Sequence, residues 1–595
     1  MNKHYKIKAL AMVVSMVSMA LSGIAQQDTT KLKKEVEVVK AYQPAIQEFQ
    51  KINDIPQIKP EQTEPPTFDY SIFSKPVFTT FDPTPVAAAK MVGEPRPELG
   101  NGMLNLGLGN YQTPYGELFF NARPDKKSNF GLHFNHLSSS GQIKLLNDDK
   151  VKAPESLNSG EIFVQRFMRN STLTGKLEFD RKAFSYYGYA ADMLTDEQKE
   201  ELIPWFGRKQ YFAKGTASVR LKSEMPLSSG LNYDFKAQYH YFTNKTGQTE
   251  REVVVGGNVS KKINNMLGLL DASLAVYKVD SVQNSNTGTY GKIDQSVLRV
   301  NPSVKWVADV ASLQVGLNAT AVLDSKTDAK FYVSPKVNAE WSPVPQVLTL
   351  FATADGYVKQ NSYSEIAAEN PYVDPYHDVA VTNYKYVVSG GFKGKFTPKT
   401  NYVAAATYSV VKDQHFYTLE SINFNGGGTV PRKINNTFNW LYDDVNVLKL
   451  SGEILHSVSD NFSIHLLGNY YSYDLKTLEK PWQMPNFDLF LSGIYKPDDQ
   501  FRFTLDIFAV GKRTAFVKDY VVSGTTSSGN VYNDFGDFTV TMDPIIDVNF
   551  GAEYYFSKNL NFFCKLNNLG FQKYEQWLGY TNKNFNWLAG ISYKF

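Results

Sequence analysis

Polar and apolar residues alternate along the last segment of the chain, from Asn584 to Phe595. A β-strand sends successive side chains to opposite faces, so this segment has one apolar, aromatic-ended face and one polar face that only Leu588 interrupts. The pattern fits two structures. One is an edge strand of a soluble sheet, and the other is a strand whose apolar face meets lipid.

The same alternation returns many times from Gly102 onward. Leu104, Leu106 and Leu108 alternate with polar or small residues, and residues 211–222 carry cations on one side and apolar groups on the other. One amphipathic strand is common in soluble proteins. About twenty of them in succession indicate a transmembrane barrel, in which lipid covers one face and water wets the other.

The connections between the expected strands are of two kinds. Short turns, such as residues 124–127 and 557–559, alternate with long polar loops. Transmembrane barrels have this asymmetry, and an even strand number places both chain ends at the short-turn side. The sequence therefore predicts an all-β fold, a transmembrane antiparallel β-barrel of about 22 strands. The long loops are expected over residues 147–158, 190–208, 360–383, 414–443 and 512–543. Strands are expected to start near residues 102, 116, 128, 159, 171, 209, 229, 251, 267, 295, 312, 330, 347, 383, 402, 444, 461, 486, 501, 545, 560 and 584.

Two sets of residues follow from this barrel. On the lipid side, the final strand would carry the signal that the barrel-assembly machinery reads during insertion, formed by Trp587, Ile591, Tyr593 and Phe595. On the water side, charged residues would line the lumen, namely Lys214, Arg220, Arg299, Lys305, Arg502 and Asp506.

The N-terminus predicts export from the cytoplasm. Lysines precede the apolar run of residues 9–21, and small residues precede a cleavage site at Gln26, so residues 1–25 are expected to be a signal peptide. An uncleaved anchor helix fits less well, because the run is short and serines break it.

Residues 26–101 are rich in proline and are expected to form an extended periplasmic arm, with the barrel over residues 102–595. Within the arm, residues 35–40 favour a short strand containing Val36, Val38 and Val39. This strand could add to a sheet edge of a partner protein. Folding back onto its own barrel is the favoured alternative.

The composition limits the kinds of partner and reaction that the chain is expected to have. The 62 Lys and Arg residues nearly balance 59 Asp and Glu residues, which gives no support for a nucleic-acid partner. The single cysteine, Cys564, has no partner for an internal disulfide, and the histidines show no metal-ligand spacing. No nucleophile or phosphate-loop motif is present. The sequence predicts no catalytic residue, cofactor or metal site, and so no enzyme.

Two of the outer loops contain candidate binding features. Residues 195–202 favour a short helix, with an exposed apolar corner after it. Tyr363, Tyr372, Tyr376 and Tyr384 crowd a second loop. Such aromatic loops can grip a ligand or a partner protein, or they can pack on one another over the pore, which is the favoured interpretation.

The closing segment resembles that of the TonB-dependent receptor family. The resemblance rests on Asn-Asn-Leu-Gly at 567–570, on Tyr574, Trp577 and Tyr580, and on the aromatic end at 591–595, and it covers about residues 102–595. It implies the barrel fold and an outer-membrane location. Those receptors carry an N-terminal plug domain much longer than this arm, so the departure speaks against energised, plug-gated uptake.

The function expected from these features is transport of solutes or polymers across the outer membrane of a Gram-negative type envelope. The alternative is a non-conducting barrel scaffold that docks other envelope proteins through its arm and outer loops. Expected partners are outer-membrane lipids, the barrel-assembly machinery, and such envelope proteins.

Overall fold

The computed structural model of the chain describes residues 101–189, 208–224, 230–280, 282–284, 288–290, 293–374, 379–424, 432–525 and 531–595. The signal segment, the arm with Val36, Val38 and Val39, and the helix expected over residues 195–202 lie outside the described residues.

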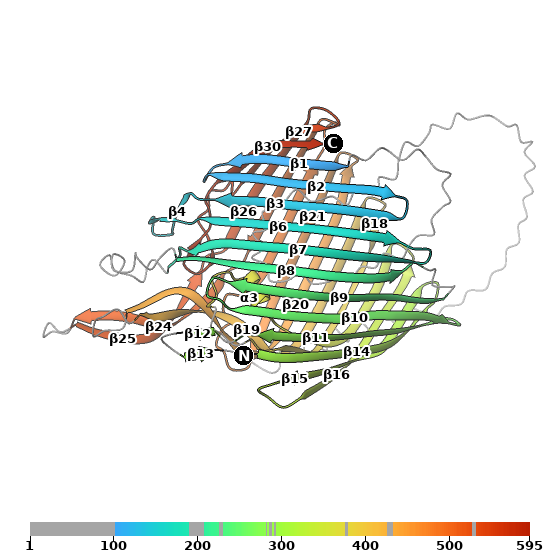
Figure 1. Cartoon of the computed structure of the whole chain (residues 1–595), viewed down its shortest axis with the longest axis horizontal. Helices are drawn as coiled ribbons and strands as arrows, with labels where there is room; N and C mark the ends of the chain where they lie inside the picture. The colour runs from blue at the N-terminus through green and yellow to red at the C-terminus, as the bar shows by residue number, and fades with distance from the viewer. Residues whose placement is uncertain are drawn as a thin grey trace, which may run out of the picture. The chain divides into compact units, whose positions relative to one another are not determined.

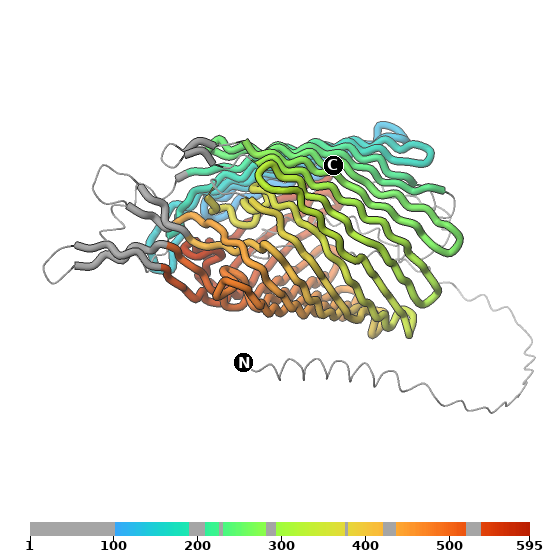
Figure 2. The backbone as a smooth tube through the Cα atoms, turned by 90° about the horizontal axis from the view of Figure 1, so that it is seen from below, coloured from blue at the N-terminus to red at the C-terminus, as the bar shows by residue number. Residues whose placement is uncertain are grey.

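Twenty-two antiparallel strands form a closed barrel, as expected from the sequence (Figure 1). Each wall strand pairs with the wall strands before and after it in the chain, and the strands are tilted against the barrel axis (Figure 2). The last wall strand pairs with the first and closes the ring, with Tyr593 opposite Leu104. The Gly102 N–H donates to the Phe595 carbonyl at 2.8 Å, which fixes the two chain segments at the seam.

The wall strands are β1 (Gly102–Gly109), β2 (Thr113–Asp125), β3 (Ser128–Ser139), β6 (Glu155–Phe167), β7 (Ser171–Tyr186), β8 (Arg208–Ser223), β9 (Leu231–Asn244), β10 (Thr249–Ile263), β11 (Met266–Val279), β14 (Ile293–Val307), β15 (Ala311–Asp324), β16 (Lys330–Val344), β17 (Leu348–Lys359), β18 (Thr382–Thr397), β19 (Thr400–Phe424), β20 (Arg432–Ser459), β21 (Phe462–Leu475), β22 (Phe487–Tyr495), β23 (Phe501–Val510), β26 (Ile545–Tyr555), β27 (Leu560–Asn567) and β30 (Asn586–Lys594).

Smaller elements lie in the connections at the end of the barrel that carries the long loops, here called the outer end (Figure 1). They are β4 (Gln142–Lys144), β5 (Lys150–Lys152), β12 (Val282–Asn284), β13 (Gly288–Tyr290), helix α3 (Tyr363–Glu369), β24 (Arg513–Thr525), β25 (Val531–Met542), β28 (Glu575–Trp577) and β29 (Tyr580–Thr581). Among the described residues, no helix is long and apolar enough to cross a membrane.

The outer face of the wall is apolar. Leu106, Leu108, Leu177 and Val219 are among many large apolar side chains that point away from the lumen and remain exposed. Such a band on a closed barrel has lipid as its natural surroundings. The four residues of the expected insertion signal lie on this face: Trp587, Ile591, Tyr593 and Phe595, between 40% and 47% exposed. Their role in insertion stays a prediction.

The structure differs from the sequence prediction in the outer loops. Residues 414–443 were expected to be a polar loop with a strand starting near residue 444, but β19 continues to Phe424 and β20 already begins at Arg432. Residues 436–440 are buried on both faces, so this part of β20 has no solvent-exposed or lipid-exposed face, unlike the one-sided strands of the wall. Residues 512–543 likewise contain the hairpin β24–β25, and Tyr384 belongs to β18 rather than to a loop.

β17 separates from β16 before its outer end, although it stays paired with β18 as far as Lys359. It pairs with residues 337–344 of β16, whereas residues 330–336 of that strand have no partner in β17. Instead, the Gly356 carbonyl accepts hydrogen bonds from Ser334 Oγ at 2.7 Å and from Asn318 Nδ2 at 2.9 Å. Val358 then packs against Val297, a fully buried residue on the lumen side of β14. The outer end of β17 therefore bends away from β16 toward the lumen while it keeps its pairing with β18.

Candidate functional site

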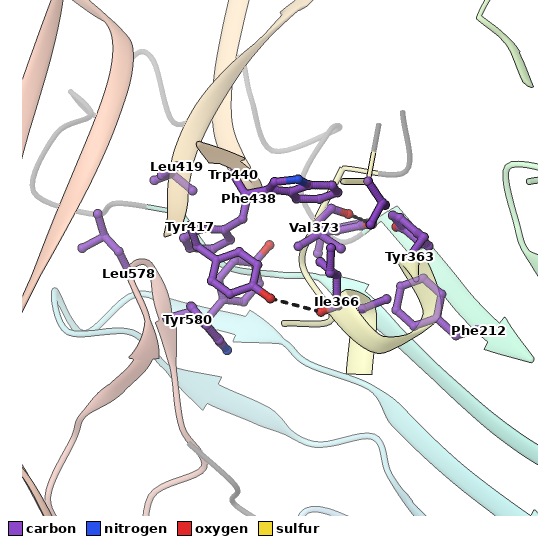
Figure 3. Close-up of a cluster of buried hydrophobic side chains, with 14 of the residues drawn as sticks. Phe212, Tyr363, Ile366, Val373, Tyr417, Leu419, Phe438, Trp440, Leu578 and Tyr580 are labelled. Carbon is purple, nitrogen blue, oxygen red and sulfur yellow. Dashed lines mark hydrogen bonds between the residues drawn. The ribbon is translucent and has the colours of Figure 1, made fainter. Parts of the chain in front are cut away.

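Three segments meet inside the outer end of the barrel and bury a cluster of aromatic and aliphatic side chains (Figure 3). We call residues 360–374 and 379–381, between β17 and β18, the cap loop. The outer hairpin is residues 413–424 and 432–443 of β19 and β20, and the closing loop is residues 568–585, between β27 and β30. Their buried members are Tyr363, Ile366, Ala367, Val373, Val379, Tyr417, Leu419, Phe438, Trp440, Trp577, Leu578 and Tyr580.

Helix α3 fastens the cap loop to the inner face of the wall. Ser362 Oγ caps the helix by accepting a hydrogen bond from the Glu365 N–H at 3.2 Å. The fully buried Tyr363 ring lies 6.3 Å from Phe212 on β8 and 5.9 Å from Phe242 on β9, measured between ring centroids. These two phenylalanines alternate with lipid-facing residues, so they point into the lumen, and α3 lies there too.

The cap loop is also joined to the outer hairpin. Val373 forms a parallel bridge with Phe438. The Asp374 N–H donates to the Phe438 carbonyl at 2.7 Å, and the Phe438 N–H donates to the Tyr372 carbonyl at 2.9 Å. The Tyr417 hydroxyl lies 3.5 Å from the carbonyl of Ile366, as the dashed line in Figure 3 marks. The cap loop thus runs from the β8–β11 side of the wall to β20.

The closing loop reaches the same cluster from the other side. Tyr580 stacks on Tyr372, and its hydroxyl donates to the backbone carbonyl of Asn436 in the outer hairpin. The Tyr187 hydroxyl donates to the Thr581 carbonyl at 3.0 Å. Burial raises the pKa of the Tyr187 and Tyr372 phenols, so both stay protonated near neutral pH.

A buried arginine holds the closing loop to the hairpin β24–β25. Arg513 is 2% exposed, and its guanidinium donates to the carbonyls of Glu575 and Gln576, each at 2.5 Å. Burial lowers the pKa of Arg513 to about 10, which still leaves it charged near neutral pH. A buried cation needs such partners, because removing it from water without them is very unfavourable.

Several polar groups in the cluster have no hydrogen-bond partner within the described part of the chain. They include Asn370 Nδ2, both side-chain polar atoms of Asn436, Trp577 Nε1 and Thr581 Oγ1. Each unsatisfied buried group costs about 1–3 kcal/mol. Opening the cluster to water would satisfy these groups, so they favour opening of the cluster rather than its closed arrangement.

The charged residues expected in the lumen alternate with the lipid-facing residues of their strands, and three of them have defined contacts. Arg220 Nε donates to Asp234 Oδ1 at 2.7 Å, Arg502 Nη1 lies 3.5 Å from Glu553 Oε1, and Arg299 Nη2 donates to the Val358 carbonyl at 3.1 Å. For the other three charged residues, the strand register gives the neighbours: Lys214 lies opposite Asp180, Lys305 opposite Gln314, and Asp506 opposite Asn549. Their part in moving a solute stays a prediction. Within the described ranges, no group of His, Cys, Asp and Glu could hold a metal ion.

The sequence interpretation missed most of this cluster. It expected tyrosines of residues 360–383 to gather over the pore, and Tyr363 and Tyr372 do pack there, while Tyr376 lies outside the described residues. It did not find the partners from the outer hairpin. The spacing of Phe438, Trp440 and Tyr442, at every second residue, was a strand signal that could have located them.

Solved structures share this fold at low sequence identity. The FrpB iron transporter from Neisseria meningitidis matches with a TM-score of 0.61 and 9% identity, over 84% of this chain and 82% of that chain. The siderophore receptor PirA from Acinetobacter baumannii matches with a TM-score of 0.60 and 10% identity, over 83% and 80%. The copper transporter OprC matches with a TM-score of 0.58 and 12% identity, over 84% and 80%.

No sequence family matches the chain, and neither does any curated protein. At these identities the structural likeness establishes the fold. The resemblance that the closing segment suggested is confirmed at that level: the chain folds as a 22-stranded barrel of the TonB-dependent receptor kind.

Proposed function

We propose that the protein lies in the outer membrane and transports solutes or polymers through its lumen, and that the cap loop, the outer hairpin and the closing loop close the outer mouth. The observation that supports this proposal is the way in which the outer mouth is closed. The described closure consists of connections between wall strands, packed through side chains and a few backbone contacts. Barrels of 22 strands enclose a lumen wide enough to need such filling.

The charge pattern of the lumen supports a water-filled path below the cap. Arg220 and Arg502, with their carboxylate partners, lie on the face opposite the lipid-facing apolar band. A scaffold with no passage would gain more from an apolar filling than from ion pairs in its interior, because ionic groups require hydration or exact pairing.

Liposome swelling with neutral sugars of increasing size tests transport directly. The mature chain is compared with a variant in which residues 362–379 are replaced by a short Gly-Ser linker. The proposal expects slow swelling for the intact chain and fast, size-limited swelling for the variant. Equal, slow swelling of both proteins, when both are folded, would argue against a passage.

The second candidate function is a scaffold for envelope proteins. It draws support from the hairpin β24–β25, which lies outside the wall and contacts β19 through a parallel pairing of two residues, Leu419 with Val517 and Glu420 with Lys518. Within the described strands, β25 pairs with β24 alone, so one of its edges is available. Cross-linking in intact cells from a photoreactive residue at Phe538, followed by identification of the product, would detect such a partner.

Two features of the arm belong to the same proposal. The strand of Val36, Val38 and Val39 is offered as a contact for a periplasmic or envelope partner. The proline-rich composition of the arm disfavours a compact plug fold, so the outer closure is proposed as the main barrier.

A further inference from the structure

We propose that Glu250 and Tyr277 form a latch that holds the cap loop across the lumen, and that releasing this latch opens the outer mouth. Neither residue belongs to the cap loop. Glu250 lies on β10 and Tyr277 on β11, directly neighbouring wall strands. The inference concerns the position of the cap loop and does not depend on which solute passes.

The latch consists of backbone donors from the cap loop and a carboxylate from the wall. Glu250 Oε1 accepts the Tyr363 N–H at 2.7 Å, and Glu250 Oε2 accepts the Ser364 N–H at 3.0 Å. The Tyr277 hydroxyl donates to Glu250 Oε1, and the Tyr363 N–H also lies 3.2 Å from that hydroxyl oxygen. One carboxylate therefore binds the first turn of α3 at two points and is itself oriented by a phenol.

Burial gives the latch its strength. Glu250 is 3% exposed and Tyr277 is 1% exposed, although both lie on the lumen side of the wall. Hydrogen bonds are electrostatically stronger in a buried site than in water, and water does not compete for them there. In the open state, water in the lumen would hydrate this carboxyl group. Opening therefore leaves no buried polar group without a partner.

The two ends of the cap loop are fixed in ways that permit movement between them. At the first end, β17 bends toward the lumen at Gly356, whose carbonyl is bound by Ser334 and Asn318. At the second end, Asn361 Nδ2 donates to the Ala380 carbonyl at 2.8 Å and to Thr382 Oγ1 at 2.9 Å, so the loop closes on itself at its base. A loop closed at its base in this way can shift as a unit when the first turn of α3 loses its contacts with the wall.

Hydrogen exchange of the full mature chain in lipid nanodiscs tests the latch without any transported solute. The variants are Glu250→Gln, Glu250→Ala and Tyr277→Phe. Glu117→Gln is the matched control, because Glu117 is also a buried lumen-face carboxylate that accepts a tyrosine hydroxyl, from Tyr115 at 2.6 Å, but its hydrogen-bonding partners among the described residues all belong to β1–β3 rather than to the cap loop. Single-channel recording of the same proteins reports whether the mouth opens.

We expect amides of residues 362–374 to exchange about tenfold faster in Glu250→Gln and faster still in Glu250→Ala, since one and then both strong bonds are lost. Tyr277→Phe should give a smaller increase. Channel openings should become more frequent in the same order, and Glu117→Gln should match the wild type. If the amides of residues 362–374 exchange at the wild-type rate in Glu250→Gln and Tyr277→Phe, the latch proposal is wrong, even if Glu250→Ala fails to fold. An equal effect of Glu117→Gln, or faster exchange without openings, would contradict the latch proposal as well.

Discussion

The ring of Tyr372 in the cap loop lies parallel to the ring of Tyr580 in the closing loop, with centroids 3.4 Å apart and planes 14° apart. The two tyrosines are far apart in the chain, and their contact joins the loops that cross the outer mouth. Tyr580 is 1% exposed and also bonds to the outer hairpin through its hydroxyl. This stack therefore ties all three segments of the closure together.

Tyr580→Ala should loosen the closure strongly. Removing a buried aromatic ring costs about 3–5 kcal/mol, and here the loss falls on the cap rather than on the wall. We expect faster amide exchange in residues 362–374 and in residues 568–585, with unchanged exchange in wall strands such as β21. Hydrogen exchange followed by mass spectrometry measures this difference.

Tyr580→Phe and Tyr241→Ala are the controls for that experiment. The phenylalanine keeps the stack and loses only the hydroxyl contact, so its effect should be small. Tyr241 is 41% exposed on the outer face of the wall, and its loss should leave the cap unchanged. A cap that stays equally protected in Tyr580→Ala would contradict the role given to this stack.

Arg513 should not tolerate lysine. Its guanidinium binds the carbonyls of Glu575 and Gln576 together, and a lysine ammonium lacks the planar fork that spans both. We expect Arg513→Lys to raise the proteolytic sensitivity of residues 568–585. Arg166→Lys, at an exposed ion pair with Asp125 near the short turns, is the control and should change nothing. Equal sensitivity of both variants would argue against the anchoring role.

The ion pair between Lys573 and Asp148 should add little to the closure. The ammonium of Lys573 lowers the pKa of the Asp148 carboxyl, so any stabilisation is present above the usual aspartate range and is lost as pH falls through the lowered pKa. Because this carboxylate is exposed, water screens the pair. We expect Asp148→Asn to leave amide exchange of the closing loop unchanged at pH 7. A marked increase would show that the pair holds the loop.

Phe595 should matter for assembly rather than for the closed state. Its side chain lies on the lipid-facing side of β30, while its backbone pairs with Gly102 at the seam. We expect Phe595→Ala to lower the amount of folded barrel in isolated membranes, seen as less heat-modifiable protein on gels. Lys594→Ala, one residue before it on the other parity, should have a smaller effect. If both variants give equal amounts of folded barrel, Phe595 is not part of the insertion signal.

The wall was predictable from sequence because each strand has one face in lipid and one in water. Leu104, Leu106 and Leu108 illustrate this alternation, and the expected strand starts lie within a few residues of the observed ones, except that of β20. The closure was not predictable in the same way. Around Phe438 both strand faces are buried, and contacts such as those of Tyr372 with Tyr580, or of Glu250 with Tyr363, join distant parts of the chain.

Single-channel conductance in planar bilayers tests most directly whether the lumen is a passage that the cap loop closes. Three proteins are needed: the mature chain, the variant with residues 362–379 replaced by a Gly-Ser linker, and the same variant that also lacks residues 26–97. We expect a silent mature chain and steady, large conductance in both variants. If the doubly shortened protein is folded and does not conduct, the lumen is not a passage that the cap closes, and the transport proposal is contradicted.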